Sequence, residues 1–258
     1  MEDKVSGKLI RQLRSQVNDL AGAVQLLTPL VTEHGGKTDL GNLTIINRNL
    51  YQLVRTVFHL ELCESEDHAF FSKPIDVADL CRELGREVET VAERLGVSFT
   101  WRLEKESILS VADEELLKLA ILNMLTNAFQ AAEKGGGVWL YCGAAGGKIR
   151  ITVSDNGEGL ELPEEDENPL LSTDSGLGLG LETARRIAAL HGGQLLLVSP
   201  KDGGVRSTLF LPIRKPEKSE RVRGKEPPGI SHLGGYSPLL VEFSPLLSSD
   251  SYRPEDID

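Results

Sequence analysis

The first 60 residues carry two heptad patterns separated by a pair of glycines. Between Ile10 and Val31, apolar side chains recur at alternating intervals of three and four residues, the spacing of a single stripe on a long helix. The pattern stops at Gly35 and Gly36 and resumes between Leu43 and Leu60. It predicts an antiparallel helical hairpin over residues 1–66, and the width of the stripe favours a dimeric four-helix bundle. A coiled-coil spacer is the alternative for this segment alone.

Residues 75–213 have a different pattern, in which helices alternate with strands. Helices are predicted at 75–94, 113–133 and 177–190, and strands at 97–103, 137–142, 148–154, 194–199 and 206–212. The alternation of Ile149, Ile151 and Val153 is typical of a half-buried strand. The predicted fold class is therefore α+β, with helices layered on one mixed sheet. Residues 214–258 are rich in Lys, Arg, Pro and Ser, and we predict a disordered tail there.

Composition excludes several classes of partner. The net charge of −11 argues against nucleic acid or an anionic membrane surface, since both attract basic proteins. The spacing of Cys63, Cys81 and Cys142 matches no metal site, and free thiols in a reducing compartment are the simpler interpretation. No run approaches the ~20 apolar residues of a membrane span, and the N-terminus resembles no signal peptide. We expect a cytoplasmic protein.

Two motifs in the α/β region contain residues suited to nucleotide and metal binding. Asn123 and Asn127 lie four residues apart on one face of the predicted 113–133 helix, where an amide oxygen can ligate Mg²⁺. Asp155 directly follows a strand, and Gly157 and Gly159 after it allow close backbone approach. A carboxylate in that position can accept a hydrogen bond from the exocyclic amine of adenine.

A third motif, Gly176-Leu-Gly178-Leu-Gly180, opens the predicted 177–190 helix. Glycines at a helix N-terminus offer bare N–H groups and a positive dipole end to phosphate. Each motif is weak alone. In this order and spacing they resemble the N, G1 and G2 boxes of the GHKL ATPase superfamily, and the resemblance to the catalytic domain of sensor histidine kinases extends over about 75–213.

The resemblance implies a Bergerat-type α/β sandwich that binds ATP with Mg²⁺. By that resemblance, Asn127, together with Asn123, holds Mg²⁺ against the triphosphate, and Asp155 reads adenine. Gly157 and Gly159 shape the adenine pocket, Gly176, Gly178 and Gly180 close over the phosphates, and Thr208 supports the adenine site through water.

The hairpin departs from the family at the residues that carry out phosphotransfer. Aligned on Asn18, the position of the phosphoacceptor histidine falls on Arg14 and that of the activating acid on Ser15. A guanidinium stays protonated and has no lone pair with which to attack phosphate. His59 is the best substitute by height, but its heptad position faces away from the seam, as for an ordinary surface histidine. Asn18 matches the family's position associated with dephosphorylation of a response regulator; a polar surface residue is the alternative.

The segment before the last predicted helix is unusually acidic. Between Arg150 and Arg185 there is no Lys or Arg, whereas Asp and Glu are frequent, including Asp174 where the family often has Lys. Acid near a triphosphate repels it, so we expect ATP binding to be weakened.

These observations predict a histidine-kinase-like, ATP-binding, homodimeric protein of two-component signalling. Without the usual phosphoacceptor it would act as a regulator, a phosphatase or an atypical kinase, with a response regulator or partner kinase as its protein partner. Two alternatives remain open: an anti-sigma-factor-type serine kinase, against which the long hairpin argues, and an adaptor with a vestigial nucleotide site.

Overall fold

The computed structural model describes residues 2–64, 69–159, 178–200, 203–215, 232–233 and 235–254. The chain divides into two compact units. One joins residues 1–68 to 232–258, and the other comprises residues 69–231. We call them the helical unit and the α/β unit and describe each by itself. No helix in the described ranges is both long and apolar enough to cross a membrane.

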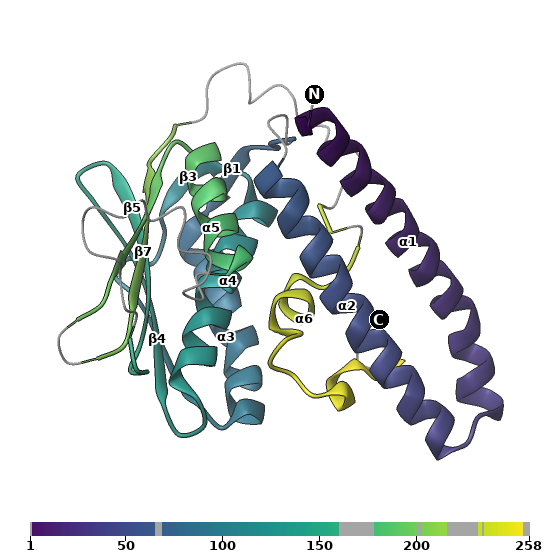
Figure 1. The fold of residues 1–258 in the computed structure, drawn as a ribbon. Helices are drawn as coiled ribbons and strands as arrows, with labels where there is room; N and C mark the ends of the chain where they lie inside the picture. The colour runs from purple at the N-terminus through teal and green to yellow at the C-terminus, as the bar shows by residue number, and fades with distance from the viewer. Residues whose placement is uncertain are drawn as a thin grey trace. The chain divides into compact units, whose positions relative to one another are not determined.

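The helical unit begins with the two predicted helices. Helix α1 (Glu2–His34) and helix α2 (Lys37–Glu64) run antiparallel on either side of a short turn at Gly35 and Gly36 (Figure 1). The turn is closed by the side chain of Asp39, which accepts a hydrogen bond of 2.8 Å from the N–H of Gly36. The sequence prediction of two N-terminal helices is confirmed.

Only part of the heptad stripe is buried within the helical unit. Val17 and Ala21 on α1 are buried. The heptad leucines Leu20 and Leu27 on the same helix are each 55% exposed to solvent. On α2, Ile46 and Leu53 are 48% and 44% exposed. Counting from the turn, Leu20 lies within about two residues of the height of Leu53, and Leu27 within about two of Ile46, since both helices rise about 1.5 Å per residue. We call the residues Leu13, Leu20, Leu27, Ile46 and Leu53 the leucine stripe.

The prediction of a disordered tail over 214–258 is wrong for its last part. Helix α6 (Pro238–Phe243) and the 3₁₀ turn η3 (Ser249–Tyr252) pack against α2. Ser237 caps α6 through its side chain, Pro238 occupies the first turn, and Phe243 and Tyr252 are fully buried. We call residues 235–254 the C-terminal segment. It orders because α2 supplies the apolar surface that an isolated tail lacks.

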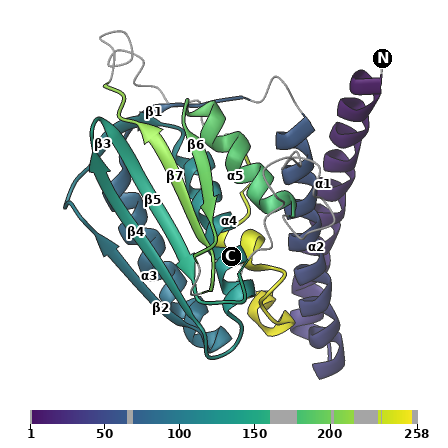
Figure 2. The ribbon, with the colours of Figure 1, turned by 60° about the vertical axis from the view of Figure 1, so that its left-hand side comes forward.

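The α/β unit contains one five-stranded mixed sheet. Its strands are β2 (Ser98–Leu103), β4 (Gly137–Ala145), β5 (Lys148–Asp155), β7 (Arg206–Pro212) and β6 (Gln194–Val198), side by side in that order (Figure 2). β2 and β4 are parallel and the other neighbours antiparallel. The short strands β1 (Lys73–Asp76) and β3 (Leu109–Ala112), absent from the sequence prediction, pair separately.

Three helices cover one face of this sheet. They are α3 (Val77–Leu95), α4 (Glu114–Ala132) and α5 (Leu179–Leu190), close to the predicted bounds (Figures 1 and 2). Ile149, Ile151 and Val153 of β5 are at most 1% exposed and face these helices, as their alternation predicts. The α+β architecture is confirmed, and it places the ends of α4, β5 and α5 around the residues of the three motifs.

Candidate functional site

Helix α4 carries the two asparagines of the first motif, and they differ in their surroundings. Asn123 is wholly buried, and its Nδ2 donates a hydrogen bond of 2.9 Å to the carbonyl of Leu119, one turn earlier. Asn127 is less buried as a residue, but its Nδ2 is enclosed and has no hydrogen-bond partner among the described residues. Buried polar groups usually have a hydrogen-bond partner, so this amide is a candidate for contact with a bound group.

Asp155, at the end of β5, is buried on the helix-facing side of the sheet. Its Oδ1 accepts two backbone hydrogen bonds, from the N–H of Gly157 at 2.9 Å and of Val205 at 3.3 Å. Both bonds fix the carboxylate through one oxygen, so Oδ2 is the atom left to accept from a ligand. Burial raises the pKa of Asp155, and the two N–H groups oppose that rise.

Glycine is required in the loop after Asp155 because other chain segments approach it closely. A Cβ on Gly157 would lie 2.4 Å from the carbonyl oxygen of Ala131, in the last turn of α4. A Cβ on Gly204, just before β7, would lie 2.0 Å from the carbonyl oxygen of Asp155. Gly159 has a φ of +88°, in the left-handed region that favours glycine. Gly157 therefore allows the Asp155 loop to lie directly against α4.

Thr208 does not face the same side as Asp155. It pairs with Thr152 across the β5–β7 ladder, and their hydroxyls lie 3.2 Å apart. Thr152 belongs to the alternate set of β5 residues that points away from the helices. Ser207 pairs with Val153 and is buried on the Asp155 side, so Ser207 is the β7 hydroxyl on that face.

The third motif is described only in part. Gly176 lies outside the described residues, Gly178 is the N-cap of α5, and Gly180 is buried in its first turn. No side chain among the described residues caps this helix end, so its first N–H groups can interact with an anion.

Sequence reasoning missed a polar contact that fixes α4 relative to α5. Asp113 caps α4 through its side chain, and its own N–H donates to Nε2 of His191, the residue that ends α5, at 3.1 Å. Nδ1 of His191 lies 2.8 Å from the carbonyl of Ile187. Burial lowers the pKa of His191, which favours the neutral ring that this pair of contacts requires.

Asn156 is another residue that the motif spacing does not single out. Its Oδ1 accepts from the N–H of Gly137 at 2.7 Å and so ties the Asp155 loop to the start of β4. Together, an amide on α4, a carboxylate oxygen at the end of β5 and free N–H groups at the start of α5 form an arrangement that suits a nucleotide.

The comparisons with known proteins identify this domain. The family model "Histidine kinase-, DNA gyrase B-, and HSP90-like ATPase" matches residues 112–215, which span α4, the Asp155 loop, α5 and β7. Residues 112–215 belong to the GHKL ATPases. The chain is 34% identical over 142 residues to the signal transduction histidine-protein kinase AtoS of Escherichia coli, covering 52% of this chain and 23% of AtoS. In this region the chain is thus similar to sensor histidine kinases.

Two solved structures share the fold. Full-length ShkA in complex with AMPPNP matches 83% of this chain and 46% of its own with a TM-score of 0.65 and 22% identity. Histidine kinase ThkA in complex with the response regulator protein TrrA matches 83% of this chain and 64% of its own with a TM-score of 0.55 and 21% identity. The chain spans less than half the length of the curated relatives it matches.

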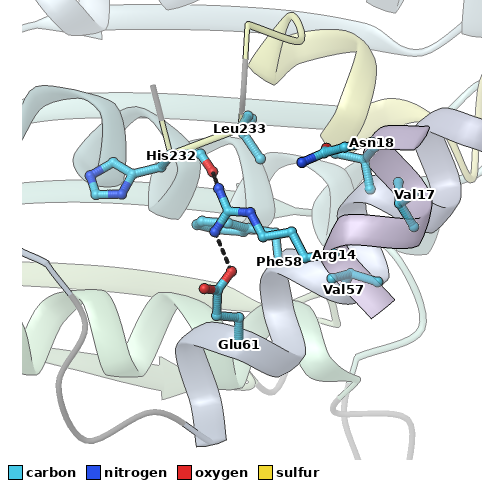
Figure 3. Close-up of a pocket in the computed structure, with 9 residues that line it drawn as sticks. Arg14, Val17, Asn18, Val57, Phe58, Glu61, His232 and Leu233 are labelled. Atoms are coloured by element: carbon cyan, nitrogen blue, oxygen red, sulfur yellow. Dashed lines mark hydrogen bonds and ion pairs between the residues drawn. The ribbon is translucent and has the colours of Figure 1, made fainter. Parts of the chain in front are cut away.

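In the helical unit, Arg14 is the residue on which the phosphoacceptor position is expected to fall from the sequence. Its guanidinium forms an ion pair with Glu61 of α2 and donates a 2.8 Å hydrogen bond to the backbone carbonyl of His232 (Figure 3). The imidazole of His232 points away from Arg14 in this view. Asn18, one turn further along α1, is exposed.

His59 is not the surface residue that its heptad position predicts. It is fully buried, and its Nε2 lies 2.9 Å from Oε1 of Glu242 in α6. Arg55 reaches the other oxygen of Glu242 at 2.9 Å. The prediction failed because the C-terminal segment covers this side of α2, which a two-helix pattern leaves in solvent.

Proposed function

We propose that the α/β unit binds ATP with Mg²⁺ between α4, the Asp155 loop and the start of α5. Oδ2 of Asp155 accepts the exocyclic amine of adenine, and Ser207 and the glycines line the same pocket. The amide of Asn127, at the phosphate end, contributes to holding Mg²⁺, whose role when bound is to neutralise the triphosphate. Asn123 acts as a support within α4, because its amide is committed to the helix backbone.

The single observation that carries this proposal is the pairing of two unfilled polar groups on one side of the sheet. Asp155 presents one oxygen beyond its two backbone bonds, and Asn127 presents an Nδ2 donor without a described partner, which suits a phosphate oxygen and leaves the amide oxygen for Mg²⁺. Both lie within the part of the chain that the family model matches.

Thermal unfolding of the whole chain with and without Mg²⁺ and ATP tests the nucleotide site. We expect the Tm of the wild type to rise with ATP, and Asp155→Ala and Asn127→Ala to abolish that rise. Thr152→Val, on the opposite face of the sheet, is the matched control and should keep the full shift. Equal shifts in the wild type and all three variants would place the nucleotide elsewhere.

This protein would not phosphorylate itself on a histidine of the hairpin. Arg14 and Ser15 stand at the positions of the phosphoacceptor and its acid, and Arg14 is tied to Glu61 and His232. His59 is no substitute, since its ring is buried against Glu242. A regulatory or phosphatase role then fits better than that of an autokinase, and Asn18 is the exposed residue positioned for it.

The leucine stripe is the surface on which a second copy would complete a four-helix bundle. Its five side chains are 36% to 55% exposed and lie at matching heights on two antiparallel helices. A response regulator would dock on the resulting homodimer, a partner class suggested by the ThkA–TrrA complex. These assignments concern the whole protein and rest on family resemblance together with the exposed stripe.

A further inference from the structure

A second candidate site lies wholly within the helical unit, where α1, α2 and the C-terminal segment meet. Here the structure contains a groove of about 660 Å³ that is open to solvent. Ligand sites of proteins commonly measure about 300–1,000 Å³, so this groove has room for a small organic molecule. None of the described residues that line it carries a charge.

The groove is on a different side of the hairpin from the leucine stripe. On α1 it is lined by Ala21, Gly22 and Gln25 among others, whereas the stripe runs along Leu20 and Leu27. At 100° per residue the two sets are centred roughly 120° apart around the helix. A second copy seated on the leucine stripe therefore leaves the groove accessible.

The wall contributed by α1 offers a hydrogen-bond acceptor that ordinary helices do not. Pro29 lies inside α1 and has no N–H to donate to the carbonyl of Gln25, four residues earlier. Both residues line the groove. A ligand with an N–H group can supply the donor that the helix lacks at this point.

The opposite wall is aromatic and depends on the C-terminal segment. Tyr51 of α2 and Tyr236 pack edge to face with ring centroids 5.1 Å apart, and Pro254 closes the same side. Asn47 holds this wall in place by donating a 3.1 Å hydrogen bond to the carbonyl of Tyr252. The groove thus exists only while the segment is docked on α2.

We propose that this groove binds an uncharged aromatic molecule that carries an amide or similar N–H donor. The neutral lining offers no counter-ion to a charged ligand, so we expect an ion to bind there more weakly than an uncharged molecule of the same shape. Because Tyr236 and Pro254 form part of the wall, ligand binding stabilises the docked C-terminal segment.

Gly22 permits a test that leaves the backbone intact. A Cβ added at Gly22 meets no atom within 4 Å, so Gly22→Leu places a side chain in the open groove. Gly41 of α2 is an equally open helical glycine that does not line the groove, and Gly41→Leu is the matched control. Both changes replace a helical glycine and should not unfold the helices.

The experiment is an NMR titration of the full chain with acetanilide, an uncharged aromatic amide, and with its anionic analogue 4-acetamidobenzoate. We expect saturable binding of acetanilide with a Kd of about 1 mM or below, unchanged in Gly41→Leu and weakened at least about tenfold in Gly22→Leu. The anion should bind at least about tenfold more weakly than acetanilide. Chemical shifts of residues 235–254 should move on binding.

Three results would overturn the proposal. Equal affinity of wild type and Gly22→Leu would place the probe elsewhere, and preference for the anion would contradict the neutral lining. If acetanilide showed no saturable binding up to about 20 mM, the groove would not be a site for uncharged aromatic amides. If Gly22→Leu instead changed the oligomeric state in sedimentation, the groove would be an interface between copies of this chain.

Discussion

Glu242 anchors the C-terminal segment, and its replacement by Gln gives a sharp test of the helical unit. The side chain is fully buried between His59 and Arg55, whose own side chains are 1% and 19% exposed. Removing one partner of a buried ion pair costs about 3–5 kcal/mol. We expect Glu242→Gln to cost about 3 kcal/mol, the lower end of this range, because the Gln side chain can still accept a hydrogen bond from Arg55, which remains partly hydrated.

Hydrogen exchange of the α6 amides measures this loss of free energy, because these amides exchange when the C-terminal segment opens locally. A loss of about 3 kcal/mol should speed exchange of residues 238–243 by roughly 100-fold while leaving α4 unchanged. Asp250→Asn is the control, because Asp250 is 78% exposed and its contact with Arg253 is 3.9 Å long. A surface pair of that kind contributes at most about 1 kcal/mol.

The same anchor predicts a dependence on pH. Burial alone raises the pKa of Glu242, but His59 and then Arg55 lower it, and the pKa ends below its ordinary value of 4.5. The docked state therefore binds fewer protons than the undocked state. Its protection is fully present above pH 4.5 and is lost as the pH falls through the lowered pKa. Unchanged exchange in Glu242→Gln, or an equal acid response in both proteins, would refute this reasoning.

Three further predictions follow from the remaining sites. Asp155→Asn should keep its two backbone bonds through Oδ1 but turn an NH₂ toward the adenine amine, so calorimetry should show ATP binding weakened about 100-fold and GTP favoured relative to ATP. Leu20→Glu should weaken self-association in sedimentation by at least tenfold, whereas Leu26→Glu, a 78% exposed leucine outside the stripe, should not. Because burial lowers the pKa of His191, stability of the α/β unit measured by urea unfolding should fall as the pH drops below 6.5, and His191→Gln should flatten that slope. Wild-type stability that is the same at pH 5.5 and 7.5 would contradict the last of these.

The sequence predicted those elements whose structure depends on a single periodicity of apolar residues. The heptads predicted both hairpin helices, and the alternation in β5 predicted which of its residues face the helices. The same alternation could have corrected the expectation for Thr208, since Leu209 and Leu211 are the buried residues of β7 and Thr208 lies between the positions of that set. The inward-facing position of Ser207 could therefore have been predicted from the sequence.

Contacts between distant segments were not recoverable in this way. His59 and Glu242 are 183 residues apart, and nothing in the pattern around either residue indicates the other. The tail has the composition of a disordered segment, yet α2 gives Phe243 and Tyr252 a surface on which to be buried. The close approach of Gly157 to Ala131 is likewise a property of the folded α/β unit, in which α4 ends beside the Asp155 loop.

Labelling with [γ-³²P]ATP and Mg²⁺ tests whether this GHKL domain binds ATP while the hairpin does not accept its phosphate. Filter binding on the same sample first establishes that the nucleotide site is filled. We expect bound nucleotide and no acid-labile label on the chain. Acid-labile phosphate on the wild type that disappears in His59→Ala would contradict this expectation.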